Sequence, residues 1–425
     1  MGKKVLVVGG GGREHAICWS IMQDKAKHRI YCAPGNAGIA QVAHCVAIEP
    51  TDIEGLLNFA KENEIDLTIV GGEVPLSLGI VDEFERNNLK IIGPSLSASR
   101  LESSKAFAKE FMTRHKIPTA PFIVADSPED AVYILESGRF GGENEPVVVK
   151  ADGLASGKGV VMAANRSAAI SAINQLTNNT DIDKKATKNI VLERMLQGIE
   201  VSLLLFSDGK NFALMPPSRD YKRIGNNNTG ANTGGMGSIC DDNLLTNSQI
   251  HESITAIIKP TLEGASKEGF EFRGILFLGL ILTDSGVKLI EYNVRFGDPE
   301  TQSILLRLQT NLTDICDSII NQQLDKAQIK FDNQKSCCII LAAKNYPAKP
   351  TLGDHILGLE TVNENIVIFH SGTIKTLTNK LLTNGGRVLG IAAKANNLKA
   401  SLDIAYNSVQ NITWKGMQYR KDIGS

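Results

Sequence analysis

The sequence predicts a multidomain protein that combines α/β and α+β structure, and its three regions lead to this class. Residues 1–103 alternate short apolar runs with helical periodicity, which is typical of a parallel sheet covered by helices on both faces. Residues 104–325 follow a mixed α+β pattern around a strand, a glycine-rich loop and another strand. Residues 326–425 favour a small C-terminal α/β unit, so we expect one domain in each range.

Composition restricts the class of partner. The chain has 425 residues, of which 42% are hydrophobic and 21% charged, and its formal net charge is −1. This balance argues against a nucleic-acid or membrane-surface binder, since both need a basic field. No run is long and apolar enough for a transmembrane segment, and the seven cysteines are scattered without C-x-x-C spacing. We therefore expect a cytoplasmic protein with reduced thiols and small-molecule partners. We also expect a monomer, although the composition does not determine the oligomeric state.

The N-terminal region is expected to form strands at residues 5–8, 29–33, 67–70 and 90–92 and helices near 14–23, 52–63 and 78–87. The loop G-G-G-G-R-E-H at residues 9–15 offers free amides at a helix N-terminus, which suit a phosphate. It is not a dinucleotide fingerprint, because Glu14 replaces the third glycine. A tight strand-to-helix turn explains this loop equally well. Loops at 33–38 and 71–76 also follow strand ends, and His15 either caps a phosphate or packs.

A strand, a glycine-rich loop and a second strand follow at residues 147–161. The loop fails the Walker pattern, because three residues separate its glycines and neither Ser nor Thr follows its lysine. Lys150 closes an apolar strand, where an unpaired ammonium is costly, so we expect a phosphate partner. Lys158 is either a second phosphate ligand or a solvated surface lysine. Small residues such as Gly157 let the loop backbone approach a ligand.

Two later segments have both functional and structural interpretations. Residues 190–200 are expected to form an apolar strand that leads into a turn. Glu193 and Glu200 in this segment either contact a nucleotide or are two exposed acids beside the turn. The cluster R-D-Y-K-R at 219–223 contains Asp220 and precedes a Gly/Asn-rich tract at 225–237. Such a tract is usually a flexible loop, but beside dense charge it equally fits a closing lid.

Residues 290–300, I-E-Y-N-V-R-F-G-D-P-E, carry the strongest chemical signal. Positions i and i+2 of a strand share a face, so Glu291 and Asn293 point the same way and can share one hard cation such as Mg2+. Arg295 follows on that face as a bidentate anion clamp. An exposed edge strand is the alternative, but the apolar run at 274–282 favours a buried sheet.

The assembled segments resemble the phosphoribosylamine-glycine ligase family of purine synthesis, in the ATP-grasp superfamily. The resemblance rests, in chain order, on V-V-G-G-G-G-R-E-H-A, A-P-G-N-A-G, V-V-K-A-D-G-L-A-S-G-K-G-V, N-T-G-G-M-G, E-Y-N-V-R-F-G-D-P-E-T-Q, T-N-G-G-R-V-L-G and the C-terminal Y-R-K-D-I-G. G-G-R-E-H-A, R-F-G-D-P-E-T-Q and R-K-D-I-G together are specific to this family. Gly72 and Ala231 stand where the family pattern has prolines, which is expected to loosen two loops.

The resemblance implies a Rossmann-like, pre-ATP-grasp domain over residues 1–103 and an ATP-grasp domain over 104–325, with a mobile flap at about 123–190. A small C-terminal α/β domain over 326–425 is expected to contain strands at 337–343, 366–370 and 387–393 and a helix at 398–411. This last domain is expected to pack against the first and close the substrate cleft.

The resemblance also implies an ATP-dependent ligase that joins glycine to 5-phosphoribosylamine through glycyl phosphate, giving glycinamide ribonucleotide, ADP and phosphate. By this analogy ATP is bound by Lys105, Lys150, Gly157, Lys158, Glu193 and Glu200, and Mg2+ or Mn2+ by Glu291 and Asn293. The expected catalytic residues are Arg295, Lys150, Asp220 and Asp298, and the expected substrate contacts are Gly11, Gly12, Arg13, Glu14, Asn36 and Arg295. Phosphoryl transfer needs mainly positioning and charge neutralisation, which these residue types supply.

Two other functional classes stay open. One is an ATP-grasp ligase or carboxylase with a different acceptor. The G-G-R-E-H-A loop and the R-K-D-I-G end argue against it. The other is a non-catalytic nucleotide-binding protein, which would not require a complete set of metal ligands and lysines. A dehydrogenase is excluded by the incomplete dinucleotide fingerprint.

Overall fold

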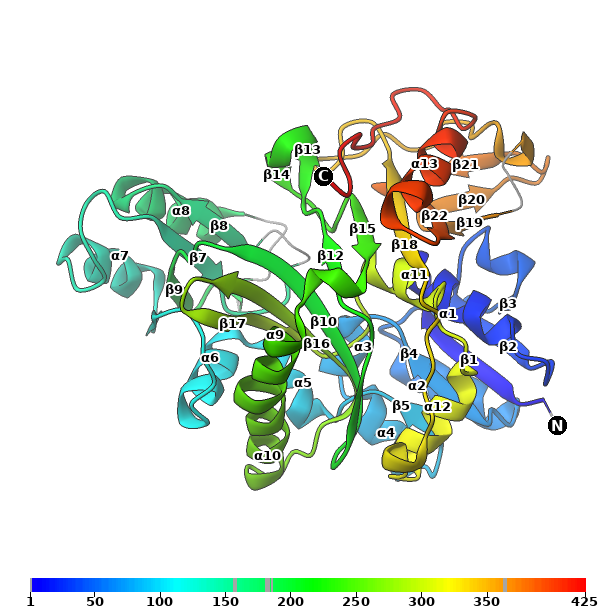
Figure 1. The fold of residues 1–425 in the computed structure, drawn as a ribbon, viewed down its shortest axis with the longest axis horizontal. Helices are drawn as coiled ribbons and strands as arrows, with labels where there is room; N and C mark the ends of the chain where they lie inside the picture. The colour runs from blue at the N-terminus through cyan, green and yellow to red at the C-terminus, as the bar shows by residue number, and fades with distance from the viewer. Residues whose placement is uncertain (1, 156–158, 180–183, 185, 362–364) are drawn as a thin grey trace.

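The computed structural model describes residues 2–155, 159–179, 184, 186–361 and 365–425 (Figure 1). The expected phosphate residues Gly157 and Lys158 lie outside the described residues. In Figure 1 the N-terminal sheet lies to the lower right, the C-terminal elements lie above it, and the strands β7 and β8 lie to the left.

The N-terminal region is the parallel sheet that the strand-helix alternation predicts. Its strands run in the order β3-β2-β1-β4-β5, and all neighbouring strands in this order pair in parallel. The sequence-based prediction did not include α3, α5 or the short β3. The elements are β1 (Lys4–Gly9), α1 (Gly12–Met22), β2 (Arg29–Pro34), η1 (Ile39–Gln41), β3 (His44–Cys45), α2 (Ile53–Glu62), β4 (Leu67–Val70), α3 (Glu73–Ser77), α4 (Ile80–Arg86), β5 (Ile91–Ile92) and α5 (Leu96–Ser103).

A separate antiparallel sheet, in the order β6-β9-β7-β8, follows the helix α6 (Lys105–Arg114). It has its own apolar core, in which Val149 of β7 packs with Ile134 of α7 and Ile173 of α8. This unit covers about the residues of the expected flap, and the mobility of that flap stays a prediction. Its elements are β6 (Phe122–Ala125), α7 (Pro128–Glu136), β7 (Val147–Ala151), β8 (Val160–Ala163), α8 (Arg166–Asn178) and β9 (Ile190–Arg194).

The remaining large sheet runs through two of the expected domains. Its order is β17-β16-β10-β12-β15-β18-β22-β19, and β11 pairs with β10 off this path. The antiparallel pairing of β15 with β18 joins the middle of the chain to its C-terminal part, so the expected boundary near residue 326 separates regions that share one sheet.

The elements of this sheet that precede the expected boundary are β10 (Ile199–Asp208), β11 (Phe212–Leu214), β12 (Ser218–Asp220), β15 (Gly237–Cys240), β16 (Arg273–Thr283) and β17 (Gly286–Asn293). Outside the sheet lie β13 (Arg223–Gly225), η2 (Asn226–Asn228), β14 (Thr229–Asn232), η3 (Asp242–Leu244), α9 (Asn247–Glu252), a π-helical turn (Ser253–Ile258), α10 (Lys259–Lys267), α11 (Glu300–Leu305), α12 (Leu312–Ile320) and η5 (Leu324–Lys326).

The C-terminal strands and helix match the sequence-based prediction, and the short strand pair β20 and β21 was not predicted. The elements are β18 (Lys335–Ala342), η6 (Leu359–Thr361), β19 (Ile366–His370), β20 (Thr373–Lys375), β21 (Leu381–Thr383), β22 (Arg387–Ala395) and α13 (Leu398–Val409).

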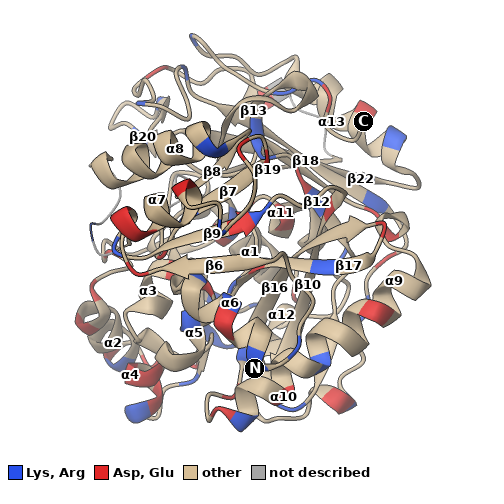
Figure 2. Cartoon of the chain, turned by 90° about the vertical axis from the view of Figure 1, so that its left-hand side faces the viewer, with Lys and Arg blue, Asp and Glu red and all other residues tan. Residues whose placement is uncertain are grey.

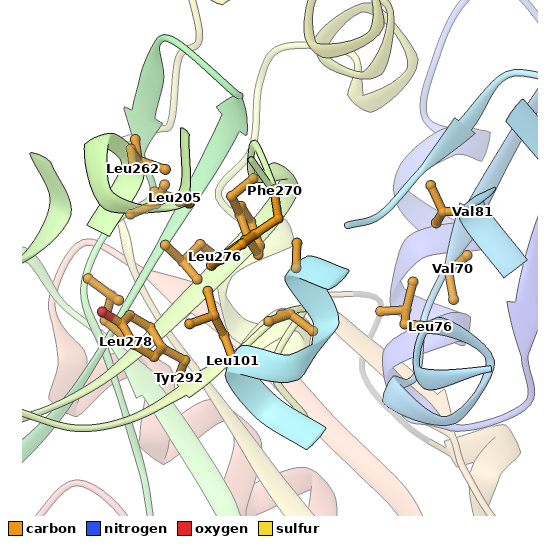
Figure 3. Close-up of a cluster of buried hydrophobic side chains, with 14 of the residues drawn as sticks. Val70, Leu76, Val81, Leu101, Leu205, Leu262, Phe270, Leu276, Leu278 and Tyr292 are labelled. Carbon is orange, nitrogen blue, oxygen red and sulfur yellow. The ribbon is translucent and has the colours of Figure 1, made fainter. Parts of the chain in front are cut away.

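One apolar cluster joins the N-terminal sheet to the large sheet. Figure 3 shows Leu101 of α5 beside Leu276, Leu278 and Tyr292 of the large sheet. The same cluster includes Val70 from β4, and all of these side chains are buried. Burial of each large apolar side chain in this cluster contributes about 1.5–3 kcal/mol to stability. The cluster therefore fixes α5, and with it the N-terminal region, against β17.

Charges on the surface are mixed in sign. Figure 2 shows both acidic and basic residues on α4 and on α10. Across the residues that the structure describes, no helix combines the length and apolar character needed to cross a bilayer.

Two histidines lie where the N-terminal region meets the C-terminal strands. His15 of α1 is buried, and its Nδ1 accepts a hydrogen bond of 2.8 Å from the backbone N–H of His370. Burial and the neighbouring His370 lower the pKa of His15 to about 3, and burial lowers the pKa of His370 to about 4. Of its two interpretations, the structure therefore favours packing for His15.

These histidines make folding sensitive to acid. In the unfolded chain these two histidines take up protons near pH 6.5, whereas in the folded chain they stay neutral until a lower pH. Their contribution to the free energy of unfolding is therefore fully present above pH 6.5 and falls as the pH drops toward their folded-state pKa values. The loss approaches about 1.4 kcal/mol per pH unit for each histidine. We expect His15→Asn, whose side-chain oxygen can accept the same hydrogen bond, to show a shallower decline between pH 6.5 and 4.5 in urea unfolding.

The matched control is His251→Asn on α9, because His251 is exposed. It should decline with pH as the wild type does. Equal pH slopes for wild type and His15→Asn would contradict this account of the interface.

Candidate active site

The site is built on β17, where Glu291 pairs with Gly279 of β16 and Asn293 pairs with Phe277. Glu291 and Asn293 therefore lie on one face, as strand periodicity predicts. Tyr292 between them is buried on the other face, with its hydroxyl 2.6 Å from Thr261 Oγ1. A Cβ at Gly279 would lie 3.2 Å from Glu291 Cγ, so this glycine leaves room for the carboxylate.

Glu291 faces cations from separate parts of the chain. They are Lys222 between β12 and β13, Lys150 of β7, Lys105 of α6 and Arg295 after β17. Burial acts to raise the pKa of Glu291, but these positive charges together hold it below its usual value. The carboxylate is therefore ionised, and the cluster presents several positive charges to any ligand beside it.

Lys105 is fixed where α6 meets the glycine-rich loop. Ser104 caps the helix by accepting from Phe107 N, and its hydroxyl donates to Asp152 Oδ1 at 3.0 Å. Lys105 Nζ donates to the carbonyl of Gly153 at 2.7 Å, and burial lowers the pKa of this lysine. An ammonium held at the base of this loop is well placed for a phosphate.

Lys150 and Glu193 form a buried ion network with Lys109. Glu193 Oε1 lies 2.6 Å from Lys150 Nζ, and its Oε2 lies 2.8 Å from Lys109 Nζ. All three side chains are at most 4% exposed, and burial lowers the pKa of Lys109 to about 8. Glu193 thus neutralises and orients two lysines. Its expected contact with a nucleotide stays a prediction.

Glu200 is more accessible than Glu193. Its side chain is 50% exposed, and its carboxylate pairs with Lys222 at 2.8 Å. Lys222 therefore interacts with both Glu200 and Glu291. A ribose diol that approached Glu200 would lie beside this lysine.

Arg295 is held by carboxylates on two sides. Its Nε lies 3.2 Å from Glu73 and its Nη2 lies 2.9 Å from Glu102, and Nη2 also donates to Asn293 Oδ1 at 3.1 Å. Glu102 is fixed in turn by the backbone N–H of Val294 at 2.7 Å. The guanidinium is therefore oriented by the end of α5 and the start of α3, beside the two expected metal ligands.

Asp220 lies in a buried acidic environment. Burial and the neighbouring Glu300 raise its pKa well above the usual range, and its Oδ1 is among the buried side-chain atoms without a hydrogen-bond partner in the described chain. Glu300 accepts from Ser202 Oγ at 3.0 Å. Two neighbouring buried carboxyls with spare acceptor capacity favour a cationic ligand such as an ammonium group.

Asp298 joins the middle of the chain to the C-terminal strands. Its Oδ2 lies 2.9 Å from Arg387 Nη2, and its Oδ1 accepts from Gln302 Nε2 at 2.7 Å. Arg387 Nη1 also donates to the carbonyl of Asp298 at 2.8 Å. Asp298 Oδ2 would be 3.7 Å from a Cβ at Gly11, so this carboxylate borders the N-terminal glycine loop.

The strand-end loop at 33–38 meets the glycine loop at 9–15 at that border. Asn36 Nδ2 donates to the carbonyls of Gly10 and His370 at 2.9 and 2.8 Å, while its Oδ1 accepts from two backbone amides. Since its hydrogen-bonding groups are occupied, Asn36 positions the loop. Its expected contact with substrate stays a prediction.

Arg13 and Glu14 lie beneath the same loop. Glu14 Oε2 accepts from Gly11 N at 2.6 Å, and its Oε1 lies 2.7 Å from Arg13 Nε. Arg13 Nη1 donates to the carbonyl of Phe296 at 3.1 Å, which links the loop to the segment after β17. Gly11 and Gly12 open α1, so their backbone groups face the junction of the N-terminal, central and C-terminal elements.

Several residues of this site are missing from the sequence-based prediction. They are Lys109, Lys222, Glu73, Glu102, Glu300 and Arg387. The spacing of Lys105 and Lys109, one helical turn apart, is a signal for the first of these. The acids around Arg295 come from distant elements, so no local pattern indicates them.

Family comparisons cover almost the whole chain. Residues 3–102 match the family model of the phosphoribosylglycinamide synthetase N domain, residues 103–301 its ATP-grasp (A) domain and residues 336–425 its C domain. A phosphoribosylamine-glycine ligase from Caldanaerobacter subterraneus subsp. tengcongensis is 43% identical over 99% of each chain. Another, from Pasteurella multocida, is 41% identical over 99% of this chain and 97% of the relative.

Solved structures show the same fold. The crystal structure of phosphoribosylamine-glycine ligase from Thermotoga maritima matches with a TM-score of 0.83 and 32% identity, covering 99% of this chain and 100% of that one. The biotin carboxylase domain of the Hydrogenobacter thermophilus 2-oxoglutarate carboxylase matches with a TM-score of 0.72 and 16% identity, covering 99% and 92%. The second likeness shows the fold alone. Together the matches confirm the N-terminal, ATP-grasp and C-terminal architecture.

The buried network around Glu193 gives a stability prediction. Lys109→Met keeps the apolar stem but removes one of the two ammonium groups that face Glu193. Breaking a buried pair typically costs about 3–5 kcal/mol, so we expect a loss in that range in urea unfolding at pH 7. Lys61→Met, on the exposed side of α2, should change stability by less than about 0.5 kcal/mol. A loss of similar size in both variants would contradict a structural role for the network.

Proposed function

The chain belongs to the phosphoribosylglycinamide synthetase family, and we propose that it is an ATP-dependent ligase that joins glycine to 5-phosphoribosylamine. The products are glycinamide ribonucleotide, ADP and phosphate, and the reaction belongs to purine biosynthesis. Its relatives named phosphoribosylamine-glycine ligase support this assignment over the full chain. We further propose a monomer that acts in the cytoplasm.

The observation that carries the proposal is the convergence of cations on Glu291. Lysines from α6, from the flap strand β7 and from the loop after β12 all act on this carboxylate. Such a set suits a triphosphate whose terminal phosphoryl group is transferred, because phosphoryl transfer depends on charge neutralisation and positioning.

The residues present fit a divalent metal. Among the described residues no group of three or more His, Cys, Asp or Glu side chains forms a metal cage. Glu291 and Asn293 supply one carboxylate and one amide oxygen on a shared face, which is the kind of partial set that Mg2+ completes with phosphate oxygens and water. We propose that these two residues hold Mg2+ or Mn2+, which when bound neutralises and aligns the phosphates.

In the first step, the glycine carboxylate attacks the γ-phosphorus of ATP, the bond to the β-phosphate oxygen breaks and ADP leaves. Lys105 and Lys150 hold the phosphates, with Lys150 oriented by Glu193. Arg295 holds the carboxylate end of glycine or the developing acyl phosphate. Asp220, with its unpartnered Oδ1, holds the amino group.

In the second step, the amine of phosphoribosylamine attacks the acyl carbon of glycyl phosphate, the bond from that carbon to the phosphate oxygen breaks, and the released phosphate takes up the proton that the nitrogen loses. We propose that the 5-phosphate lies at the glycine loop around Gly11 and Gly12, with Arg13 behind it, and that Asp298 borders the incoming amine. An acyl phosphate must be kept from water, so the flap and the segment at 225–237 act as covers. No nucleophile from the chain takes part.

Removing the charge of Glu291 tests the metal site. Glu291→Gln is nearly isosteric, so we expect the protein still to fold with a cooperative thermal transition while ADP formation falls by at least about 100-fold. Glu271→Gln, at an exposed position just before β16, is the matched control and should retain wild-type turnover. A Glu291→Gln variant that keeps most of its activity would remove Glu291 from the metal site.

Dependence on both acceptor substrates tests the reaction. ADP release is measured with Mg2+ and ATP, adding glycine and phosphoribosylamine, made in place from ribose 5-phosphate and ammonia, separately and together. We expect ADP in quantity only when both are present. Nucleotide binding without such turnover would point to a different acceptor or to an inactive relative.

A further inference from the structure

The segment from Tyr221 to Gly235 leaves the large sheet after Asp220 and carries Lys222 into a hairpin. Lys222 lies at the base of this hairpin, next to Asp220 of β12, and β13 and β14 form its two arms. Residues 226–231 are exposed, and the register of the arms shifts between Arg223 and Gly225. This β13–β14 hairpin therefore needs external contacts to hold a fixed position.

The last residues of the chain supply such contacts at the tip of the hairpin. Arg420 Nη1 donates to the carbonyl of Arg223 at 3.2 Å and to Asn228 Oδ1 at 2.9 Å. Asp422 Oδ2 accepts from the backbone N–H of Asn227 at 2.7 Å. In Figure 1 the C-terminus lies directly beside β13 and β14.

Arg420 is unusual because it is fully buried, at 1% exposure. Its Nη2 lies 2.6 Å from Asp422 Oδ2, and its guanidinium carbon lies 5.1 Å from the centre of the Tyr221 ring. A buried guanidinium is costly unless its donors are satisfied, so the R-K-D-I-G end is organised around these hairpin contacts.

Two further contacts hold the base of the hairpin. Tyr221 OH, next to Asp220 and Lys222, accepts from the backbone N–H of Gly424 at 2.9 Å. At the other end, Arg387 Nη1 donates to the carbonyl of Gly234 at 2.5 Å. The C-terminal region therefore forms hydrogen bonds with the hairpin at its tip and at both ends of its base.

The hairpin also touches the flap. Arg223 Nη2 lies 3.9 Å from Met162 Sδ on β8, and the carbonyl of Arg223 is the group that Arg420 binds. The chain terminus and the flap strand thus meet on one residue of the hairpin.

We propose that the C-terminal segment Arg420–Asp422 is a positioning element of the ligase site, which fixes the β13–β14 hairpin and thereby aligns Lys222 at its base for catalysis. The effect on turnover rests on the proposed function, whereas the anchoring itself does not. A misplacement of about 1 Å in such groups can lower turnover by a large factor.

Two variants weaken the anchor from opposite sides. Asn226→Ala removes the side-chain oxygen that accepts from the backbone N–H of Lys421 at 2.9 Å, and Asn226 is exposed. Asp422→Asn removes the charge that faces Arg420. The control is Asp403→Asn in α13, which breaks an exposed ion pair with Lys399 in the same region.

Amide hydrogen–deuterium exchange of the full-length protein without ligands is measured first. We expect both test variants to exchange at least about tenfold faster over residues 221–234, with wild-type exchange in β15 and β18 and an unchanged melting temperature for Asn226→Ala. The control should exchange as the wild type does. Unchanged exchange in the hairpin of both test variants would overturn the anchor.

Turnover is then measured with glycine varied. We expect kcat/KM for glycine to fall about tenfold or more in the test variants and to stay at the wild-type value in Asp403→Asn. Faster hairpin exchange with wild-type kcat/KM would overturn the positioning role. A wild-type protein without glycine-dependent ADP release, but with the expected exchange response, would overturn the proposed ligase and leave the anchor standing.

Discussion

The mutual placement of Glu291 and the cations around it is the constraint on which the rest of the site depends. Lysines brought close together repel one another unless acids or a ligand neutralise them. The chain supplies those acids separately, with Glu193 on Lys150 and Glu200 on Lys222. Each pair holds its lysine in place before any ligand arrives, which is the preorganisation that charge-stabilising catalysis requires.

The architecture brings these charges together from units that are remote in sequence. Lys150 comes from the flap sheet and Glu291 from the large sheet, and α5 joins the N-terminal region to the large sheet through a shared core. The continuous pairing from β15 to β18 places the C-terminal strands within reach of the same site. Arg387 on β22 contacts Asp298, and the buried Arg420 contacts the β13–β14 hairpin, so side chains of the third region contact segments beside the site.

Local patterns in the sequence were sufficient to predict the parallel N-terminal sheet, the C-terminal strands and the shared face of Glu291 and Asn293. These features depend on strand and helix periodicity, which near neighbours in the sequence determine. The same patterns were insufficient to predict the partners of Glu193 and Arg295. Those partners come from α6, α3 and α5, and only tertiary folding sets their distances. The continuity of the large sheet across residue 326 was missed for the same reason.

A crystal structure with Mn2+ and a non-hydrolysable ATP analogue would test the central claim most directly, since anomalous scattering locates the metal independently of the protein map. The account predicts an anomalous peak bound by Glu291 and Asn293 oxygens, with the terminal phosphates beside Lys105 and Lys150. A metal bound away from β17, or phosphates remote from both lysines, would contradict it.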